Sequence, residues 1–326
     1  MKKRIAFSLI CILFLIGCQE AIQETEEHED FHEQPNNFTH YIGKDLQDVI
    51  ADLKMSYEQG PSRYGYEWAV FKNENKYISV GHVNSKVKTI VLVGENVIEG
   101  NFSIGDKYED VTRNVAIQNA VTVHNRTGEY RFELTEEERN ARPLVQLTKD
   151  VYAQLYFDRF TKTLVAVRFM DDETLLKHRP YRLVYRGNIK KYTSAAGLKK
   201  TDIDRMNEKQ IYDVTNIIRK QYGKSKLIWS SKLANVAFLH SKDMKENDYF
   251  AHVSPTQGDL KKRLKKGNIA YTLAGENIAA GYPDGLDAVI GWLNSPDHRE
   301  ALLNGEFTHI GVGVFDKYYT QNFIKN

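Results

Sequence analysis

The first residues of the chain constrain it most, because they predict that it folds after export from the cytoplasm. Lys2, Lys3 and Arg4 form a positive start, and residues 5–16 are apolar over the length of a signal-peptide core. A helix that spans a membrane stably needs about twenty apolar residues, so this stretch is too short for one. The sequence therefore predicts a signal peptide at residues 1–17.

The apolar stretch ends in LIGC at residues 15–18, which resembles the lipobox of bacterial lipoproteins. The small residue before the cut fits the peptidase, and the thiol of Cys18 is the only nucleophile there that can take a diacylglycerol. The resemblance implies a lipid anchor on Cys18 at the extracellular face of a bacterial cell membrane. Two alternatives stay open: an ordinary signal peptide with a chance cysteine, and an uncleaved anchor helix.

The cysteine content limits how the exported chain can be held together. Of the two cysteines, Cys11 lies in the removed stretch and Cys18 becomes the acylated terminus, so no thiol is left for a disulfide. Such a chain depends on hydrophobic cores, and the 309 residues left after removing 17 from 326 have room for about two domains. Removal also takes the formal charge from +2 to −1, so no nucleic-acid partner is expected.

Residues 18–37 are expected to form an acidic tether. From Gln19 to Asn37 the sequence has seven acidic residues, no Lys or Arg, and almost no apolar side chain. Such a segment buries too little surface to offset its ordering entropy, and its charges repel one another and extend it. Metal capture by His28, His32 and the acids is the less favoured alternative.

An internal repeat organises residues 38–172. The segment IGKDLQDV at 42–49 returns as IGDKYEDV at 104–111, and each copy predicts a turn that opens a short helix. Alternating apolar residues predict one hairpin over 77–93, around Asn84-Ser85. A second hairpin is predicted over 151–170 around Asp158-Arg159, with Val165, Val167 and Phe169 on one face. Two helix-plus-hairpin units predict one α+β domain, and the segment resembles the N-terminal domain that accompanies CAP domains in YlbC-like bacterial proteins.

Residues 173–200 carry eight Lys or Arg and a single acid, Glu173. The favoured interpretation is a solvated basic connector; the alternative is a surface that contacts anionic wall polymers or lipid headgroups. The boundaries predict that residues 38–172 and residues 201–326 each fold alone.

Helical periodicity begins near Asp204 and is followed by a strand pattern at the chain end. Between them lie four short motifs: YFAH at 249–252, GENI at 275–278, WLNSPDHR at 292–299 and FTHIGVG at 307–313. Their order and spacing over 207–324 resemble the CAP superfamily, which comprises cysteine-rich secretory, antigen 5 and pathogenesis-related 1 proteins. The resemblance implies an α-β-α sandwich with a large surface cleft in residues 201–326.

The resemblance also implies which residues line that cleft, where family members commonly hold two histidines and two glutamates. By motif, His252 and His298 match the histidines and Glu276 matches the first glutamate. The second glutamate is expected three residues after Trp292, where this sequence has Ser295. The role of His309 in the following loop is left open.

Two neutral imidazoles, His252 and His298, make zinc the candidate metal, with Glu276 to orient a ligand or water. The alternative is that Glu276 and His298 form a buried cluster that only holds loops together. Neither HExxH nor a nucleophile elbow occurs, so an enzyme would need Glu276 or His252 as general base.

Three functions follow from these patterns. The favoured one is a binding module whose cleft takes a lipid, peptide or cell-wall ligand. The second is a structural or partner-binding role in envelope or spore assembly. The third is a metal-assisted hydrolase or peptidase.

Overall fold

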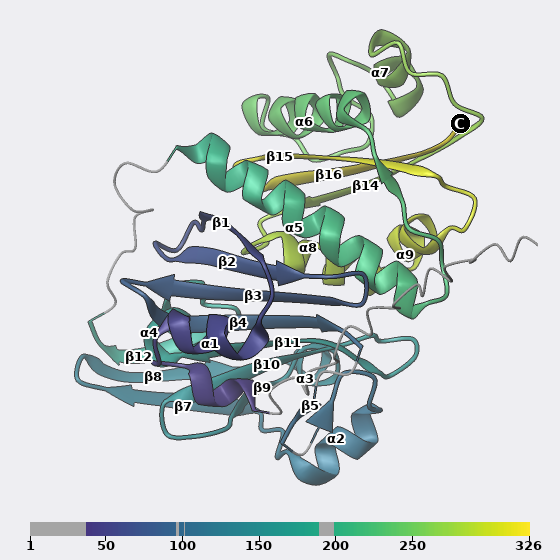
Figure 1. The fold of residues 1–326 in the computed structure, drawn as a ribbon. Helices are drawn as coiled ribbons and strands as arrows, with labels where there is room; N and C mark the ends of the chain where they lie inside the picture. Colours follow the sequence, from purple (N-terminus) through teal and green to yellow (C-terminus); the bar gives the residue numbers. More distant parts are fainter. Residues whose placement is uncertain (1–36, 96–97, 101, 189–198) are drawn as a thin grey trace, which may run out of the picture. The chain divides into compact units, whose positions relative to one another are not determined.

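A seven-stranded antiparallel sheet organises the N-terminal half of the chain (Figure 1). The structure, a computed structural model, describes residues 37–95, 98–100, 102–188 and 199–326; the predicted signal peptide, Cys18 and nearly all of the predicted tether lie outside these residues. In sheet order the strands are β1 (Tyr57–Pro61), β2 (Glu67–Lys72), β3 (Lys76–Val83), β4 (Lys86–Gly94), β11 (Leu164–Asp171), β10 (Val151–Phe157) and β9 (Leu144–Gln146).

Both predicted hairpins are present and lie next to each other in this sheet. β3 and β4 turn at Asn84 and Ser85, whose φ angles of +48° and +62° are in the left-handed region that Asn tolerates. β10 pairs with β11, and β11 pairs with β4, so the two hairpins form the middle of the sheet. The helices predicted from the repeat are α1 (Leu46–Leu53) and α2 (Tyr108–Asn114), and the α+β class is confirmed.

The prediction that Val165, Val167 and Phe169 share one face is wrong for Val165. Tyr156 pairs with Ala166 whereas Phe157 pairs with Leu164, so Val165 is the extra residue of a β-bulge. Val165 joins the core beneath the C-terminal half, while Val167 and Phe169 join the core beneath α1. Alternation in a sequence cannot reveal a bulge, because one unpaired residue reverses the faces of all residues beyond it.

The first half of the predicted basic connector is folded. Helix α4 (Asp172–His178) caps the sheet, and β12 (Arg182–Gly187) pairs with β8, giving a three-stranded sheet in the order β12-β8-β7. Residues 189–198 lie outside the described residues. The other N-terminal elements are η1 (Phe38–Tyr41), β5 (Ile98–Glu99), β6 (Phe102–Ser103), β7 (Ala120–Asn125), β8 (Gly128–Glu133) and α3 (Glu136–Ala141).

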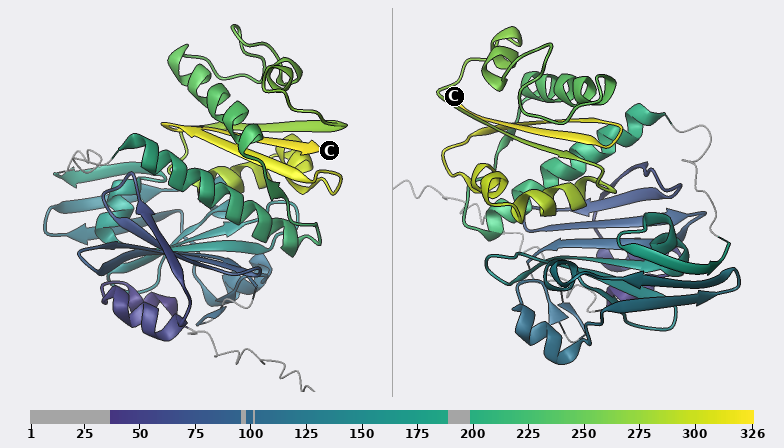
Figure 2. Two further views of the ribbon diagram at one scale, coloured as in Figure 1. Left: turned by 45° about the horizontal axis from the view of Figure 1, so that its top comes forward. Right: turned by 180° about the vertical axis from the view of Figure 1, so that it is seen from behind.

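The C-terminal half is the predicted α-β-α sandwich (Figures 1 and 2). Its sheet has the order β13-β15-β16-β14, with α6 packed on β15 and β16, and with α5 and α8 on the other face. The bounds are α5 (Lys200–Gln221), β13 (Ile228–Trp229), α6 (Ser231–Glu246), α7 (Leu260–Lys266), β14 (Leu273–Ala280), α8 (Gly285–Leu293), α9 (Pro296–Leu303), β15 (His309–Phe315) and β16 (Tyr318–Lys325).

Two glycines of the FTHIGVG motif allow α6 to lie directly on the sheet. A Cβ atom at Gly311 would come within 2.2 Å of the backbone nitrogen of Ala234, and one at Gly313 within 1.9 Å of that of Phe238. No side chain fits at such distances, so β15 must have glycine wherever the α6 backbone crosses it. The close approach fixes α6, and with it the loop that follows α6.

One hydrophobic core is built from both halves. Helix α5 lies between the two sheets in Figure 1, with contacts to β3 and β4 on one side and to β15 on the other. The core contains Val91 and Val93 of β4 together with Val214 of α5 and Val289 of α8, all almost fully buried. This shared core is at odds with the expectation that the two halves fold independently, because separation would expose it to water.

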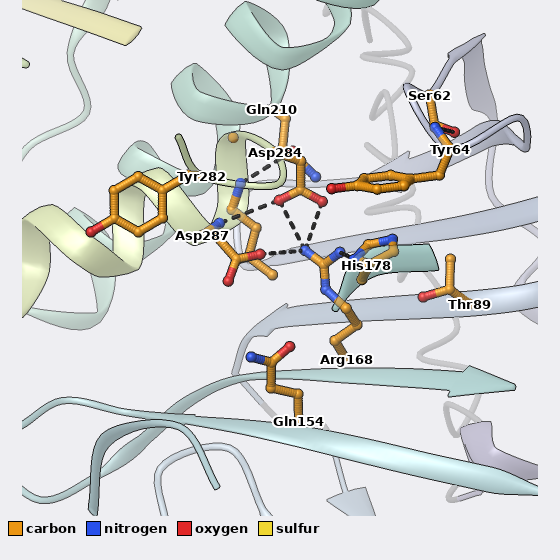
Figure 3. A network of polar contacts seen from close by, with 12 residues as sticks. Ser62, Tyr64, Thr89, Gln154, Arg168, His178, Gln210, Tyr282, Asp284 and Asp287 are labelled. Atoms are coloured by element: carbon orange, nitrogen blue, oxygen red, sulfur yellow. Dashed lines mark hydrogen bonds and ion pairs between the residues drawn. The ribbon is translucent and has the colours of Figure 1, made fainter. Parts of the chain in front are cut away.

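A buried polar network also joins the halves (Figure 3). Arg168 of β11 has no exposed surface, and its Nη2 lies 2.7 Å from Asp284 and 3.1 Å from Asp287, at the start of α8. Its Nη1 lies 3.2 Å from Nδ1 of His178. A guanidinium only donates, so this Nδ1 accepts and His178 is neutral. Burial and the charge of Arg168 hold the pKa of His178 well below its usual range.

Candidate ligand-binding site

Three segments of the C-terminal half bring the predicted site residues together. His252 lies in the loop after α6, Glu276 on β14, and Ser295 and His298 at the start of α9. The rings of His252 and His298 have centroids 6.4 Å apart and planes inclined by 33°. Residues separated by 46 positions thus lie on either side of a small surface site.

Glu276 is the buried centre of this site. Its side chain is 3% exposed, and its Oε1 accepts a hydrogen bond from Nδ1 of His252 at 2.9 Å. Burial raises the pKa of Glu276, but hydrogen bonds from His252 and Arg263 outweigh this, so the pKa lies below its usual value. Glu276 is therefore a carboxylate at neutral pH.

Arg263 of α7 is a site residue that the sequence reasoning missed. Its Nη1 and Nη2 donate to the two oxygens of Glu276 at 2.7 and 2.9 Å, and Nη2 also donates to the backbone oxygen of His252 at 2.8 Å. Only arginine can make such a paired contact with a carboxylate. A signal was present: it is the one Arg among the lysines of α7, on the same side of the helix as Leu260 and Leu264.

His298 is held in place by its own helix and by β14. Its Nδ1 lies 2.8 Å from the hydroxyl of Ser295, and its backbone oxygen accepts from Asn277 at 3.0 Å. Burial lowers the pKa of His298, and the nearby ring of His252 lowers it further. Ser295, in place of the expected glutamate, thus orients His298 without adding a charge.

His240 is a second residue that the sequence reasoning missed as part of the site. It lies on the buried face of α6, and its Nε2 is 3.9 Å from Oε1 of Glu276. Burial lowers its pKa to about 4, although Glu276 acts in the opposite direction. A histidine among the apolar residues of a helix gave the signal, but its partner on β14 could not be read from the sequence.

His309 lies apart from these contacts. It begins β15, and its Nδ1 lies 2.9 Å from the hydroxyl of Thr308 and 3.4 Å from the side-chain nitrogen of Asn326. The His309 ring therefore contacts Thr308 and the C-terminal residue, away from the contacts of His252.

The residues present do not fit a resident zinc ion. Among the described residues, no three His, Cys, Asp or Glu side chains converge to hold a metal. Both oxygens of Glu276 accept hydrogen bonds from Arg263, so only the Nε2 atoms of His252 and His298 are left as possible zinc ligands in this site. With Zn–N bonds of about 2 Å, two imidazoles on one tetrahedral zinc have centroids about 5 Å apart, so the rings would need to approach by about 1 Å.

Two family profiles match this chain. The one described as CAP-associated N-terminal matches residues 42–181, and the one described as cysteine-rich secretory protein family matches residues 212–324. Over 308 residues the chain is 42% identical to the membrane protein YlbC of Bacillus subtilis strain 168, covering 94% of this chain and 89% of that protein. The chain belongs to the CAP family. The sequence-based resemblance to CAP proteins with an accessory N-terminal domain is thereby confirmed.

Solved CAP-family structures resemble both halves together. An extracellular protein containing an SCP domain from Bacillus anthracis strain Ames has a TM-score of 0.84 and 43% identity, covering 93% of this chain and 99% of that one. A cysteine-rich secretory protein from Staphylococcus aureus Mu50 has a TM-score of 0.78 and 25% identity, covering 90% and 97%. The protein YkwD of Bacillus subtilis strain 168 is 41% identical over 119 residues, which is 36% of this chain and 46% of that protein.

The names of these relatives place them at or outside a membrane, which supports an extracellular type of CAP protein. In the part of the chain that the structure describes, no helix combines the length and the apolar character needed to cross a bilayer.

Proposed function

We propose that this CAP protein is anchored through Cys18 at the outer face of a bacterial membrane and acts there as a binding module. The proposed ligand contacts His252 and His298. The LIGC motif supports the anchor, and relatives named as a membrane protein and as an extracellular protein support the location. The ligand class is a polar fragment of lipid, peptide or cell wall.

One observation carries the binding role: an exposed imidazole is fixed on a buried support. His252 exposes 53% of its side chain, whereas its partner Glu276 exposes 3%. A carboxylate acceptor requires the proton on Nδ1, so neutral His252 presents the lone pair of Nε2 to solvent. A ligand that donates a hydrogen bond meets an acceptor whose orientation costs little further entropy.

The same contacts favour binding over catalysis. Arg263 engages both oxygens of Glu276 and lowers its pKa, so Glu276 is a poor general base. The free Nε2 of His252 could accept a proton, but the sequence has neither a nucleophile elbow nor an HExxH motif to supply the partner that such a base would activate. A structural role is the second candidate, because Arg263 joins α7, β14 and the His252 loop. The two roles differ in whether His252 Nε2 contacts a ligand.

Imidazole NMR signals of residues 34–326 test the proposal. We expect a soluble disaccharide-peptide wall fragment or glycerophosphoglycerol to shift the ring signals of His252 and His298, and His252→Ala to abolish saturable binding. His309→Ala is the matched control and should leave binding unchanged. If saturating concentrations of both probes leave the two rings unshifted, the binding role of this site is wrong and the structural role remains.

A further inference from the structure

Helix α7 presents four lysines on one surface. In the seven residues Leu260–Lys266, Leu264 and Arg263 are buried, while Lys261, Lys262, Lys265 and Lys266 are exposed. In residues 37–95, 98–100, 102–188 and 199–326 none of the four lysines makes an ion pair; Lys266 donates to the side-chain oxygen of Gln257. Four unpaired positive charges on two turns of helix repel one another, so an anionic partner would reduce this electrostatic repulsion.

The helix that carries these lysines is firmly held. Asp259 caps its first turn by accepting from the backbone of Lys262 at 2.8 Å. Leu264 packs into a small core with Val236 of α6, and Arg263 holds Glu276. The charges are thus displayed on a fixed scaffold and not on a free tail.

Exposed apolar side chains lie in the loop that leads to α7. Phe250 is 54% exposed and Val253 is 61% exposed, on either side of His252. The backbone oxygen of His252 accepts from Arg263, so this loop and α7 are fastened to each other. Residues 249–266 contain five basic residues and one acid, Asp259, a formal charge of +4 with His252 neutral.

We propose that residues 249–266 form a surface that binds an anionic phospholipid bilayer. The lysines contact lipid phosphates, and Phe250 and Val253 enter the headgroup region. A row of lysines alone would suit any polyanion, but exposed aromatic and aliphatic side chains beside it gain free energy only where they leave water. Each Lys near an anionic bilayer adds attraction, which falls with ionic strength.

This inference rests on the proposed location outside the membrane but not on any ligand at His252. A bilayer contact at residues 249–266 would add to the lipid anchor: it would orient the protein and bring the His252 loop to the lipid surface. A diacylglycerol on Cys18 carries two acyl chains, which suffice for stable anchoring. The basic and apolar surface would therefore orient the folded part of the chain on the bilayer, while the lipid holds the protein there.

Vesicle co-sedimentation of residues 34–326, which lack Cys18, tests the surface. We expect binding to vesicles of phosphatidylcholine with 30% phosphatidylserine, little binding to phosphatidylcholine alone, and loss of binding in 0.5 M NaCl. Changing Lys261, Lys262, Lys265 and Lys266 to Gln should weaken binding by about tenfold or more. The matched control changes four exposed lysines elsewhere, Lys44, Lys224, Lys226 and Lys232, and should bind as the unchanged protein does.

A second pair of variants separates a bilayer from a soluble polyanion. Phe250→Ser with Val253→Ser should weaken vesicle binding roughly threefold or more, whereas Ile228→Ser, at an equally exposed site, should not. Equal binding by the α7 lysine variant and the unchanged protein would refute the proposal. The proposal would also be refuted if polyphosphate competed with vesicles for the protein and the Phe250 and Val253 changes had no effect on vesicle binding. That result would indicate a site for soluble polyanions. The vesicle assay uses neither of the probes that test the His252 site. The bilayer surface and the ligand site are therefore tested separately, and failure of one proposal does not decide the other.

Discussion

Arg168 of β11, in the N-terminal sheet, forms a buried ion pair with Asp284, the residue just before α8 of the CAP half, with 2.7 Å between Nη2 and Oδ2. The sequence separates them by 116 residues. Asp284 also caps α8, since it accepts from the backbone of Asp287. One carboxylate therefore starts a CAP helix and neutralises a charge of the accessory domain.

Asp284→Asn should lower the free energy of unfolding by about 3 kcal/mol, because Asn keeps the cap but leaves Arg168 short of a charge partner in the core. Denaturant unfolding measures the loss. Asp259→Asn alters an exposed cap of α7 and is the matched control, expected to change stability by less than about 0.5 kcal/mol. Equal effects of the two changes would mean that the ion pair contributes nothing beyond the cap.

The shared core predicts that the two halves unfold together. Val91→Ala in β4 and Val289→Ala in α8 should each lower the free energy of unfolding by about 1–3 kcal/mol, and each variant should still unfold in a single transition. Residues 201–326 alone should expose that core and bind a hydrophobic dye, unlike residues 34–326. A dispersed NMR spectrum and undiminished stability of the isolated fragment would restore the original expectation of independent folding.

His240 should make the protein labile to acid. Its pKa is lowered to about 4 in the folded state, so the unfolded chain takes up a proton first as pH falls below about 6.5, and stability declines until about pH 4. At pH 5 this amounts to about 2 kcal/mol. His240→Gln should shrink the difference in unfolding free energy between pH 7 and pH 5 by that amount, while His40→Gln, at an exposed position, should not.

Two imidazoles are too few ligands to retain a resident zinc ion, so zinc added to His252 and His298 should bind reversibly and only weakly, with micromolar affinity or weaker, roughly 8 kcal/mol or less. Binding should weaken as pH falls, because a protonated imidazole cannot coordinate. Calorimetry should show loss of binding in His252→Ala and His298→Ala, stronger binding in Ser295→Glu, and no change in His309→Ala. Binding that survives both alanine changes would place the metal elsewhere.

Cys18→Ser should leave the precursor uncleaved, or release it without lipid, because the hydroxyl does not take the diacylglycerol. Labelling with a fatty-acid analogue and globomycin-sensitive processing check this. A wild-type protein that is cleaved but carries no label would show that the cysteine is incidental.

Local patterns in the sequence were enough for much of the fold. The repeated IGKDLQDV and IGDKYEDV segments predicted α1 and α2, and alternation predicted the β3–β4 and β10–β11 hairpins, because each depends on residues close in the chain. Alternation failed at Val165, where a bulge depends on how β10 pairs with β11. The charge content of residues 173–200 predicted a solvated connector, but part of this segment forms β12 by pairing with β8.

For the site, the sequence by itself determined the residue types: the CAP motifs indicated His252, Glu276 and His298, and the structure brings them together with Ser295. Only the tertiary structure decided what those residues can do. Arg263 and His240 join Glu276 from two other helices, and Arg168 meets Asp284 across the two halves. Periodicity reports which face of an element is apolar, but a buried charge is balanced by whichever element packs over it, and packing is a property of the whole fold.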